Sequence, residues 1–453
     1  MNLIPHKPGL GSPGPDSKRS ARRPFFIGAV AVSLATCGSS LLLLSRGRSP
    51  AGAIKSESAA AKSAHESAQS GEPRETALPA SVGAATGQGP AGGERPDGGP
   101  ATAAPGPPAV LEPSPQTRQW VNALVQPGMT LTPELAAQWK QNLQQLIREG
   151  AAALPAIREF LGRNVDLDFG PGGSQILGYS SARAAMFDAL EQIGGPEALS
   201  VMLQTLQTTG DPREIALLAQ SLDKQVPGQY RSEALNASRE ALAMAAQGKL
   251  EGRDVGPLFE VLQKFGGAAA VSDLEQASTH WKYYAVLSLA QLPDGAGIPA
   301  LIEMARDPAA GGKGTLSVAL EMLARVAPQY PEARSALIEQ ARQNKIPPGS
   351  WPYLASSLSG EEYQYSESVF CAAPTAPAGA GLKTIHINFG NQNLYSAGGI
   401  GDSDSDQINR RVSLIDEVLS ASNDPAAALL LRKTRDALLK RLIQVAGITA
   451  PGQ

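Results

Sequence analysis

One pattern of helix ending recurs along the middle of the sequence. A leucine stands at positions 190, 222, 262, 289 and 323. Except at position 222, this leucine is followed by any two residues, then by an apolar residue, and then by Gly, Pro or Ala. In most copies a turn and a second amphipathic stretch come next. Helix–turn–helix units that repeat every roughly 30 to 40 residues are typical of an α-solenoid, because one helix pair cannot bury its apolar face without a neighbour. The repeat therefore predicts an all-α fold of stacked helices over residues 117–360.

The clearest copy also carries a resemblance to a known family. Residues 297–308 read Gly-Ile-Pro-Ala-Leu-Ile-Glu-Met-Ala-Arg-Asp-Pro, and Asp211-Pro212 gives the same Asp-Pro break. This region resembles the HEAT-repeat family, in which the first helix of a repeat ends in this way. The Val-Arg that follows Asp-Pro in the family is missing here, and the unequal spacing implies inserted loops. The resemblance implies a HEAT-like solenoid of the bacterial, membrane-anchored type, which offers an extended surface to other macromolecules.

The N-terminal residues 1–24 form a basic tail in front of an apolar run. Phe25–Leu44 carries no charge, and Arg22 and Arg23 stand just before it. At about 1.5 Å per residue such a run spans about 30 Å, the thickness of the hydrocarbon core of a bilayer. We expect residues 25–45 to form a transmembrane signal anchor, with the bulk of the chain outside the cytoplasm because the basic flank stays inside.

Two other interpretations of this segment stay open. Leu34–Cys37 resembles the lipobox of a lipoprotein signal, although a threonine before the cysteine is atypical. Arg22–Phe26 resembles a twin-arginine signal. An uncleaved anchor is favoured because Leu41–Leu44 continues the apolar run past every plausible cleavage point. All three interpretations place the bulk of the chain outside the cytoplasm.

The next segment, residues 46–116, has the composition of a linker. Ala, Gly, Pro and Ser fill most of its positions, and it contains no Phe, Trp or Tyr. Such a chain cannot bury enough apolar surface to offset its conformational entropy, so we expect a disordered linker. Order is expected from residue 117 onward. Within this region, Thr132 is expected to be a helix N-cap and Pro133 the first residue of that helix.

The pattern changes again after the repeats. Residues 361–406 are expected to form an irregular segment with one short strand at 383–389, where apolar and polar residues alternate. Residues 407–447 are expected to form a helical hairpin, in which Asp424 caps the second helix and Pro425 is its first residue.

The sequence gives little sign of catalytic or metal chemistry. Cys37 and Cys371 are the only cysteines and lie too far apart in unlike surroundings for a disulfide framework or a Cys-based zinc site. Only His280 and His386 fall in segments expected to be ordered, and no nucleophile or metal-ligand motif is present. The formal charge of −3 offers no excess of cations for nucleic acid. We therefore expect no cofactor, no metal, no nucleic-acid partner and no enzymatic activity.

Two clusters are candidates for contact with a protein partner. Asp166, Asp168 and Phe169 lie in an unusually long connection, and Trp281 and Tyr283 lie in an aromatic cluster at a helix start. Aromatic side chains dominate the energetics of many interfaces. The alternative for the first cluster is an ordinary loop with Phe169 packed on the core. The alternative for the second is a helix whose inward face includes Trp281.

Taken together, these features predict a membrane-anchored scaffold or adaptor of the cell envelope that binds a protein partner through a solenoid surface. The other hypothesis is an accessory protein or a divergent enzyme that acts on envelope polymers. Such an enzyme would need paired carboxylates in a groove.

Overall fold

The structure, a computed structural model, describes residues 112–125, 131–250, 252–307, 314–371, 384–389, 392–398 and 404–447. Most of these residues are α-helical, which confirms the all-α class. Within the described residues, no helix is both long and apolar enough to cross a bilayer. The expected basic tail, the expected anchor and the expected linker up to residue 111 all lie outside the described part of the chain.

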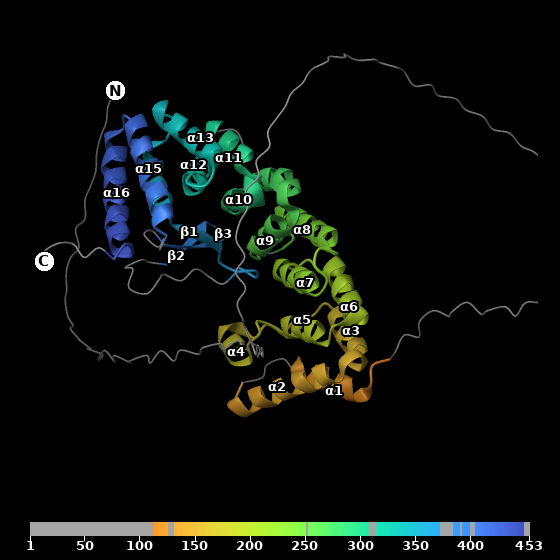
Figure 1. Ribbon diagram of the computed structural model, residues 1–453. Helices are drawn as coiled ribbons and strands as arrows, with labels where there is room; N and C mark the ends of the chain where they lie inside the picture. The colour runs from red at the N-terminus through yellow and green to blue at the C-terminus, as the bar shows by residue number, and fades with distance from the viewer. Residues whose placement is uncertain are drawn as a thin grey trace, which may run out of the picture. The chain divides into compact units, whose positions relative to one another are not determined.

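The helices pack in a regular order along the chain (Figure 1). From α5 onward, most helices pack on the helix that comes next in sequence and on the next but one. The first helices join this stack because α2 packs on α5 and α3 packs on α6. The α-helices are α1 (Pro115–Leu124), α2 (Pro133–Arg148), α3 (Leu154–Gly162), α4 (Gly170–Leu177), α5 (Ala182–Ile193), α6 (Gly195–Thr208), α7 (Pro212–Gln225), α8 (Arg231–Ala246), α9 (Gly256–Gly266), α10 (Val271–Gln291), α11 (Ile298–Arg306), α12 (Thr315–Val326), α13 (Pro331–Arg342), α14 (Trp351–Leu358), α15 (Ser405–Ala421) and α16 (Pro425–Val445).

Side-chain caps fix where several of these helices begin. Thr132, Asp211 and Asp424 each accept a hydrogen bond from a backbone N–H of the first turn, and a proline follows each of them. The cap accepts a hydrogen bond from an N–H that has no partner inside the helix. Proline suits the first helical position because it lacks the N–H that would be unpaired there. Helix α11 ends on Arg306, directly before Asp307. Ser114 caps α1 in the same way, so the first helix begins at Pro115, two residues before the expected start of order at residue 117.

Helix α10 is two helices joined at a kink. Trp281 has φ −130° and ψ 58°, which is outside the helical region and breaks the chain of backbone hydrogen bonds. The amides of Tyr283 and Tyr284, which begin the second half, donate instead to the Oε1 atom of Gln392, at 2.9 and 3.3 Å. A side chain more than a hundred residues away therefore caps this internal helix start.

A small antiparallel sheet covers part of the helical stack. Its strands are β1 (Glu362–Tyr365), β2 (Ile385–Phe389) and β3 (Gln392–Ala397), in the order β1-β3-β2. Tyr363 lies opposite Ser396, and Ile387 lies opposite Leu394. The sequence predicted only the strand at 383–389, which corresponds to β2 at the edge of the sheet.

The helices and the sheet share one hydrophobic core. This core begins at Val121 in α1 and continues to Leu438 in α16. It includes Tyr363 and Tyr365 of β1 and Leu394 of β3, each at most 6% exposed. The C-terminal elements extend the stack, because α15 packs on α13 and α16 packs on α14. The segment after residue 360 is thus part of the folded unit.

Candidate binding surface

The described residues after 360 are called the C-terminal segment below. Its strands β1 and β3 and the residues that follow β1 lie against the face formed by α7, α9, α10 and α12. In β1, the hydroxyl of Tyr363 donates to Glu321 of α12, and the hydroxyl of Tyr365 pairs with that of Ser288 of α10. Tyr365 also lies edge-on to Tyr284 of α10, with ring centroids 5.4 Å apart. Both β1 tyrosines therefore end on a polar group of a helix while their rings fill the core.

Tyr284 is the centre of the contact between α10 and β3. Its hydroxyl donates to Oδ1 of Asp254, at 2.7 Å, and accepts from the backbone N–H of Asn393, at 2.5 Å. Together with the cap supplied by Gln392, this joins the kink of α10 to the first residues of β3. The sheet is thus attached to the helices by hydrogen bonds as well as by apolar contact.

Burial changes the acid–base behaviour of the carboxyls under the C-terminal segment. Glu321 and Glu260 are 8% and 6% exposed. Desolvation raises the pKa of Glu321 to about 7, and the hydrogen bond from Tyr363 opposes this shift only partly. Burial likewise raises the pKa of Glu260 and of Asp254. Three acids on this face therefore hold a proton at a higher pH than exposed carboxyls do.

Residues 367–370, called the clamped segment below, follow β1 and run across α7 and α9. Glu260 of α9 accepts from the hydroxyl of Ser368 and from the backbone N–H of Val369, the latter at 2.7 Å. Gln220 of α7 donates its Nε2 hydrogen to the carbonyl of Val369, at 3.3 Å. Both backbone groups of Val369 are thus held by helix side chains.

The two ends of the clamped segment are recognised by other side chains. Arg213 of α7 lies 3.8 Å from the carboxylate of Glu367. Phe370 packs edge-on against Phe265 of α9, with centroids 5.8 Å apart, and the Nζ atom of Lys264 lies 4.5 Å above the Phe370 ring. Four successive residues therefore each meet a complementary group on two neighbouring helices.

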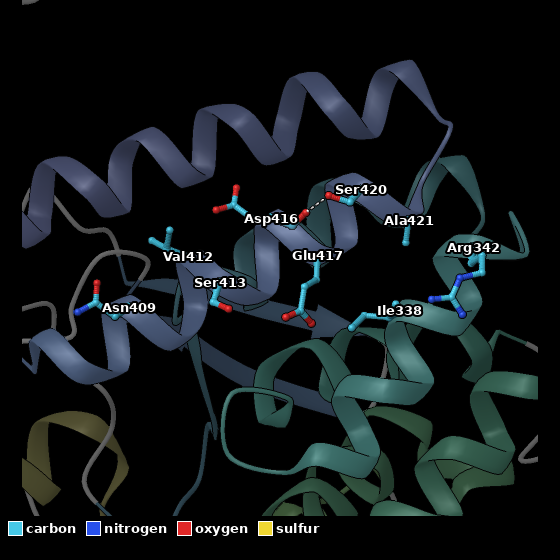
Figure 2. Close-up of a pocket in the computed structure, with 9 residues that line it drawn as sticks. All are labelled: Ile338, Arg342, Asn409, Val412, Ser413, Asp416, Glu417, Ser420 and Ala421. Carbon is cyan, nitrogen blue, oxygen red and sulfur yellow. Dashed lines mark hydrogen bonds between the residues drawn. The ribbon is translucent and has the colours of Figure 1, made fainter.

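A surface groove of about 740 Å³ lies between α13 and α15. Figure 2 shows Glu417 pointing from α15 toward Ile338 of α13, while Asp416 points to the opposite side of its helix. Both carboxylates are already paired, Glu417 with Arg334 at 2.6 Å and Asp416 with Arg435 at 2.6 Å. The groove is therefore mixed in polarity, and its charges are used to attach α15 to its neighbours.

Asp166, Asp168 and Phe169 lie together in the connection between α3 and α5. Oδ1 of Asp166 accepts from the amide of Arg183, at 3.0 Å, and Oδ1 of Asp168 accepts from the amide of Gly170, at 2.7 Å. Phe169 is half-buried and its ring lies edge-on to that of Trp139, with centroids 5.5 Å apart. The two carboxylates thus bind backbone amides at the starts of α4 and α5.

Trp281 and Tyr283 belong to a separate part of the fold, at the kink of α10. Trp281 is 4% exposed and packs against Phe259, whereas the half-buried Tyr283 meets β3 through its backbone. His280 is exposed beside Trp281. His386 is exposed on β2, with its ring 5.0 Å from that of Tyr395. The two clusters predicted from sequence do not form a single site.

Sequence reasoning missed the residues that hold β1 and the clamped segment. Glu260 and Glu321 both stand among apolar residues of amphipathic helices, in Phe259-Glu260-Val261 and in Leu320-Glu321-Met322. An acid inside an apolar helix face has to find a partner, and that was the available signal. Nothing local says that the partner lies 108 residues further along the chain for Glu260 and 42 residues further for Glu321.

In the described part of the chain, no cluster of three or more His, Cys, Asp or Glu side chains could hold a metal ion. No protein-family model matches the chain, and no curated protein matches it. A solved structure titled "Computational Design of Self-Assembling Cyclic Protein Homooligomers" is similar at 10% identity, covering 73% of this chain and 91% of that chain, with a TM-score of 0.11. A score this low supports no argument about fold or assembly.

Proposed function

We propose that this protein is a membrane-anchored scaffold of the cell envelope, which binds a protein partner through the surface of a HEAT-like solenoid. The observation that carries the proposal is the clamped segment, in which α7 and α9 bind four successive residues of an extended chain. A helical face that recognises its own chain in this way has the chemistry of a peptide-binding surface.

The packing order of the helices supports the solenoid. Most helices pack on the next helix and on the next but one, which is what two stacked layers of repeats produce. The kink of α10 supports it too, since the two halves of this helix would belong to successive repeats. Solenoids of this kind bind through extended surfaces and not through one deep pocket.

The sequence before the described residues supports the location. The apolar run at 25–44 has the length of a membrane anchor, and the basic residues in front of it favour an outward orientation of the rest. The Ala-, Gly-, Pro- and Ser-rich stretch that follows would act as a tether between the bilayer and the helices.

In-cell crosslinking tests this function. The full chain and a chain that ends at residue 111, which keeps the anchor and tether sequences, are expressed at equal abundance and crosslinked in intact cells. We expect discrete proteins to be recovered with the full chain and not with the truncated chain. Recovery of the same proteins with both chains would overturn the proposal. In the same cells, protease added to spheroplasts should remove the helical region if it lies outside the cytoplasm.

Complementation separates the scaffold from an enzyme acting on envelope polymers. A scaffold spreads its binding energy over a surface, so alanine at His280, His386, Asp166 or Asp168 should leave function largely intact. A catalyst loses orders of magnitude in rate when one essential acid or base is removed. Complete loss of function from one of these variants, at normal abundance and location, would favour the enzyme.

A further inference from the structure

We propose that the face of α7 and α9 that holds the clamped segment is a peptide site for a partner. It would bind a partner segment of the same chemistry in trans, namely an acidic residue, a hydroxyl residue, a β-branched residue and then an aromatic residue. This proposal rests on the proposed scaffold function and names the partner's recognition element. The clamped segment, Glu367-Ser368-Val369-Phe370, would then be a built-in competitor for the site.

The site is built to recognise a main chain as well as side chains. Glu260 accepts from the N–H of Val369, and Gln220 donates to the carbonyl of the same residue. A pair of side chains that satisfies both backbone groups of one residue fixes an extended peptide in position. The Val369 side chain also packs, partly buried, against the hydrophobic core, which favours an apolar residue at this position.

Specificity comes from the positions on either side of Val369. The second contact of Glu260 requires a hydroxyl donor at the position of Ser368. Phe265 and Lys264 enclose an aromatic ring at the position of Phe370 by an edge contact and a cation–π contact. Arg213 favours a carboxylate at the position of Glu367, although this pair is 42% and 51% exposed and contributes little.

The clamped segment is held less deeply than the strand before it. Tyr363 and Tyr365 of β1 are 6% and 3% exposed, whereas Ser368, Val369 and Phe370 are only half-buried. The last ladder hydrogen bond before the segment runs from the N–H of Ser366 to the carbonyl of Asn393. Release of residues 367–370 would therefore break no hydrogen bond of the sheet.

A tethered competitor lowers the apparent affinity for a partner. The clamped segment faces its site at an effective concentration of about 1 mM, as short tethers generally do. If a free peptide of this sequence binds with a Kd of about 0.1 mM, the tether occupies the site about ten times more often than it leaves it empty. Emptying the site should therefore strengthen binding of a free peptide about tenfold.

The test uses the full chain in mild detergent and a fluorescein-labelled peptide that spans residues 364–370. Binding is measured by fluorescence anisotropy for the natural chain and for the variant Ser368→Ala/Phe370→Ala, which empties the site. We expect the variant to bind the peptide about tenfold more tightly than the natural chain does. A peptide with alanine in place of its terminal phenylalanine should bind neither chain, and adding Glu260→Leu, which removes both acceptor oxygens, to the emptied variant should abolish binding.

A second measurement covers the case in which the emptied variant is destabilised. In the natural chain, hydrogen exchange of the Val369 amide should accelerate when excess peptide displaces the clamped segment, while exchange of the β1 amides stays unchanged. No tightening in a variant that melts like the natural chain, or no change in Val369 exchange at saturating peptide, would overturn the proposal. Concentration-dependent dimers that exchange their clamped segments would overturn it as well, because the occupant would then be a second copy.

The result is separable from that of the scaffold proposal. If crosslinked partners depend on the helical region but the peptide does not bind, only the assignment of this site fails. If no partner depends on the helical region, the scaffold itself fails whatever the peptide does.

Discussion

Glu321 is the residue at which pH should act most directly on the fold. It is nearly buried in α12 and accepts the hydroxyl hydrogen of Tyr363, and burial raises its pKa from 4.5 to about 7. Between these two values the folded protein binds more protons than the unfolded protein does. The stabilisation from this group is therefore complete below about pH 4.5 and is lost as the pH rises through about 7.

We expect Glu321→Gln to flatten the pH dependence of stability. The amide cannot ionise, and its carbonyl can still accept from Tyr363. The difference in free energy of unfolding between about pH 5 and about pH 8 should shrink by at most about 3 kcal/mol, as measured by urea denaturation at each pH. Glu332→Gln, at an exposed position of α13, is the matched control. Parallel pH profiles for Glu321→Gln and the natural chain would contradict this prediction.

Arg183 and Glu214 form a buried ion pair between α5 and α7. They are 2% and 8% exposed, and Arg183 also donates to the carbonyl of Leu161, at 2.8 Å. Arg183→Met leaves the Glu214 carboxylate buried without its cation, which should cost about 3–5 kcal/mol in urea denaturation. The double variant Arg183→Met/Glu214→Leu should be more stable than this single variant, because no uncompensated charge is left.

The control for this pair is an ion pair at the surface. Arg118 and Glu159 are 49% and 37% exposed, so Arg118→Met should change stability little. If the double variant is no more stable than Arg183→Met, then the loss comes from side-chain packing and the charge argument is wrong.

Among the elements, α16 depends on one residue at its start. Asp424 accepts hydrogen bonds from two amides of the first turn, and its other oxygen accepts from the indole N–H of the buried Trp351, at 3.0 Å. Asp424→Ala should cost about 1 kcal/mol for the cap and about 1–3 kcal/mol more for the unpaired indole.

Asp404 offers a matched comparison for that cap. It caps α15 through the amide of Asp406 and is exposed, with no indole to satisfy. Asp404→Ala should therefore cost only the cap itself, about 1 kcal/mol in thermal or urea unfolding. Equal losses for the two alanine variants would show that the Trp351 contact adds nothing.

The sequence predicted the helical elements better than the strands, for a physical reason. Helix starts such as Asp211-Pro212 and Asp424-Pro425 are local signals, and the structure begins helices at both. The predicted strand, β2, alternates visibly because it lies at an exposed edge. The strand β3 is buried on alternate positions that include Gln392 and Ser396, so its inward face does not look apolar in the sequence.

Local sequence patterns could not predict the candidate binding surface, for a related reason. Glu260 accepts hydrogen bonds from Ser368 and Val369. Gln392 caps the helix that begins after the kink at Trp281. Each of these contacts joins residues about a hundred positions apart in the sequence. A single sequence shows only that a buried acid or an open helix start needs a partner. It does not show which distant segment supplies one.

At the scale of the molecule, the residues after 360 complete the core that the helices begin. Leu394, Ile408 and Leu414 join the same buried cluster as the repeats, and Glu321 has its hydroxyl partner only when β1 is in place. We therefore expect a fragment of residues 112–360 to stay helical but to melt at least about 10 °C below a fragment of residues 112–447. The shorter fragment lacks several core side chains, and the burial of each contributes about 1.5–3 kcal/mol to stability.

Circular dichroism melts of the two fragments measure this difference. A comparison of two spectroscopic signals tests whether the longer fragment unfolds cooperatively. If the core is one cooperative unit, the longer fragment should unfold in a single transition that has the same midpoint by circular dichroism and by tryptophan fluorescence. Fluorescence is informative because Trp139, Trp281 and Trp351 lie buried in separate parts of the stack. Equal melting temperatures would mean that the C-terminal segment is only an addition to a self-sufficient repeat domain. Release of the clamped segment to admit a partner would then cost the fold little beyond that segment's own contacts.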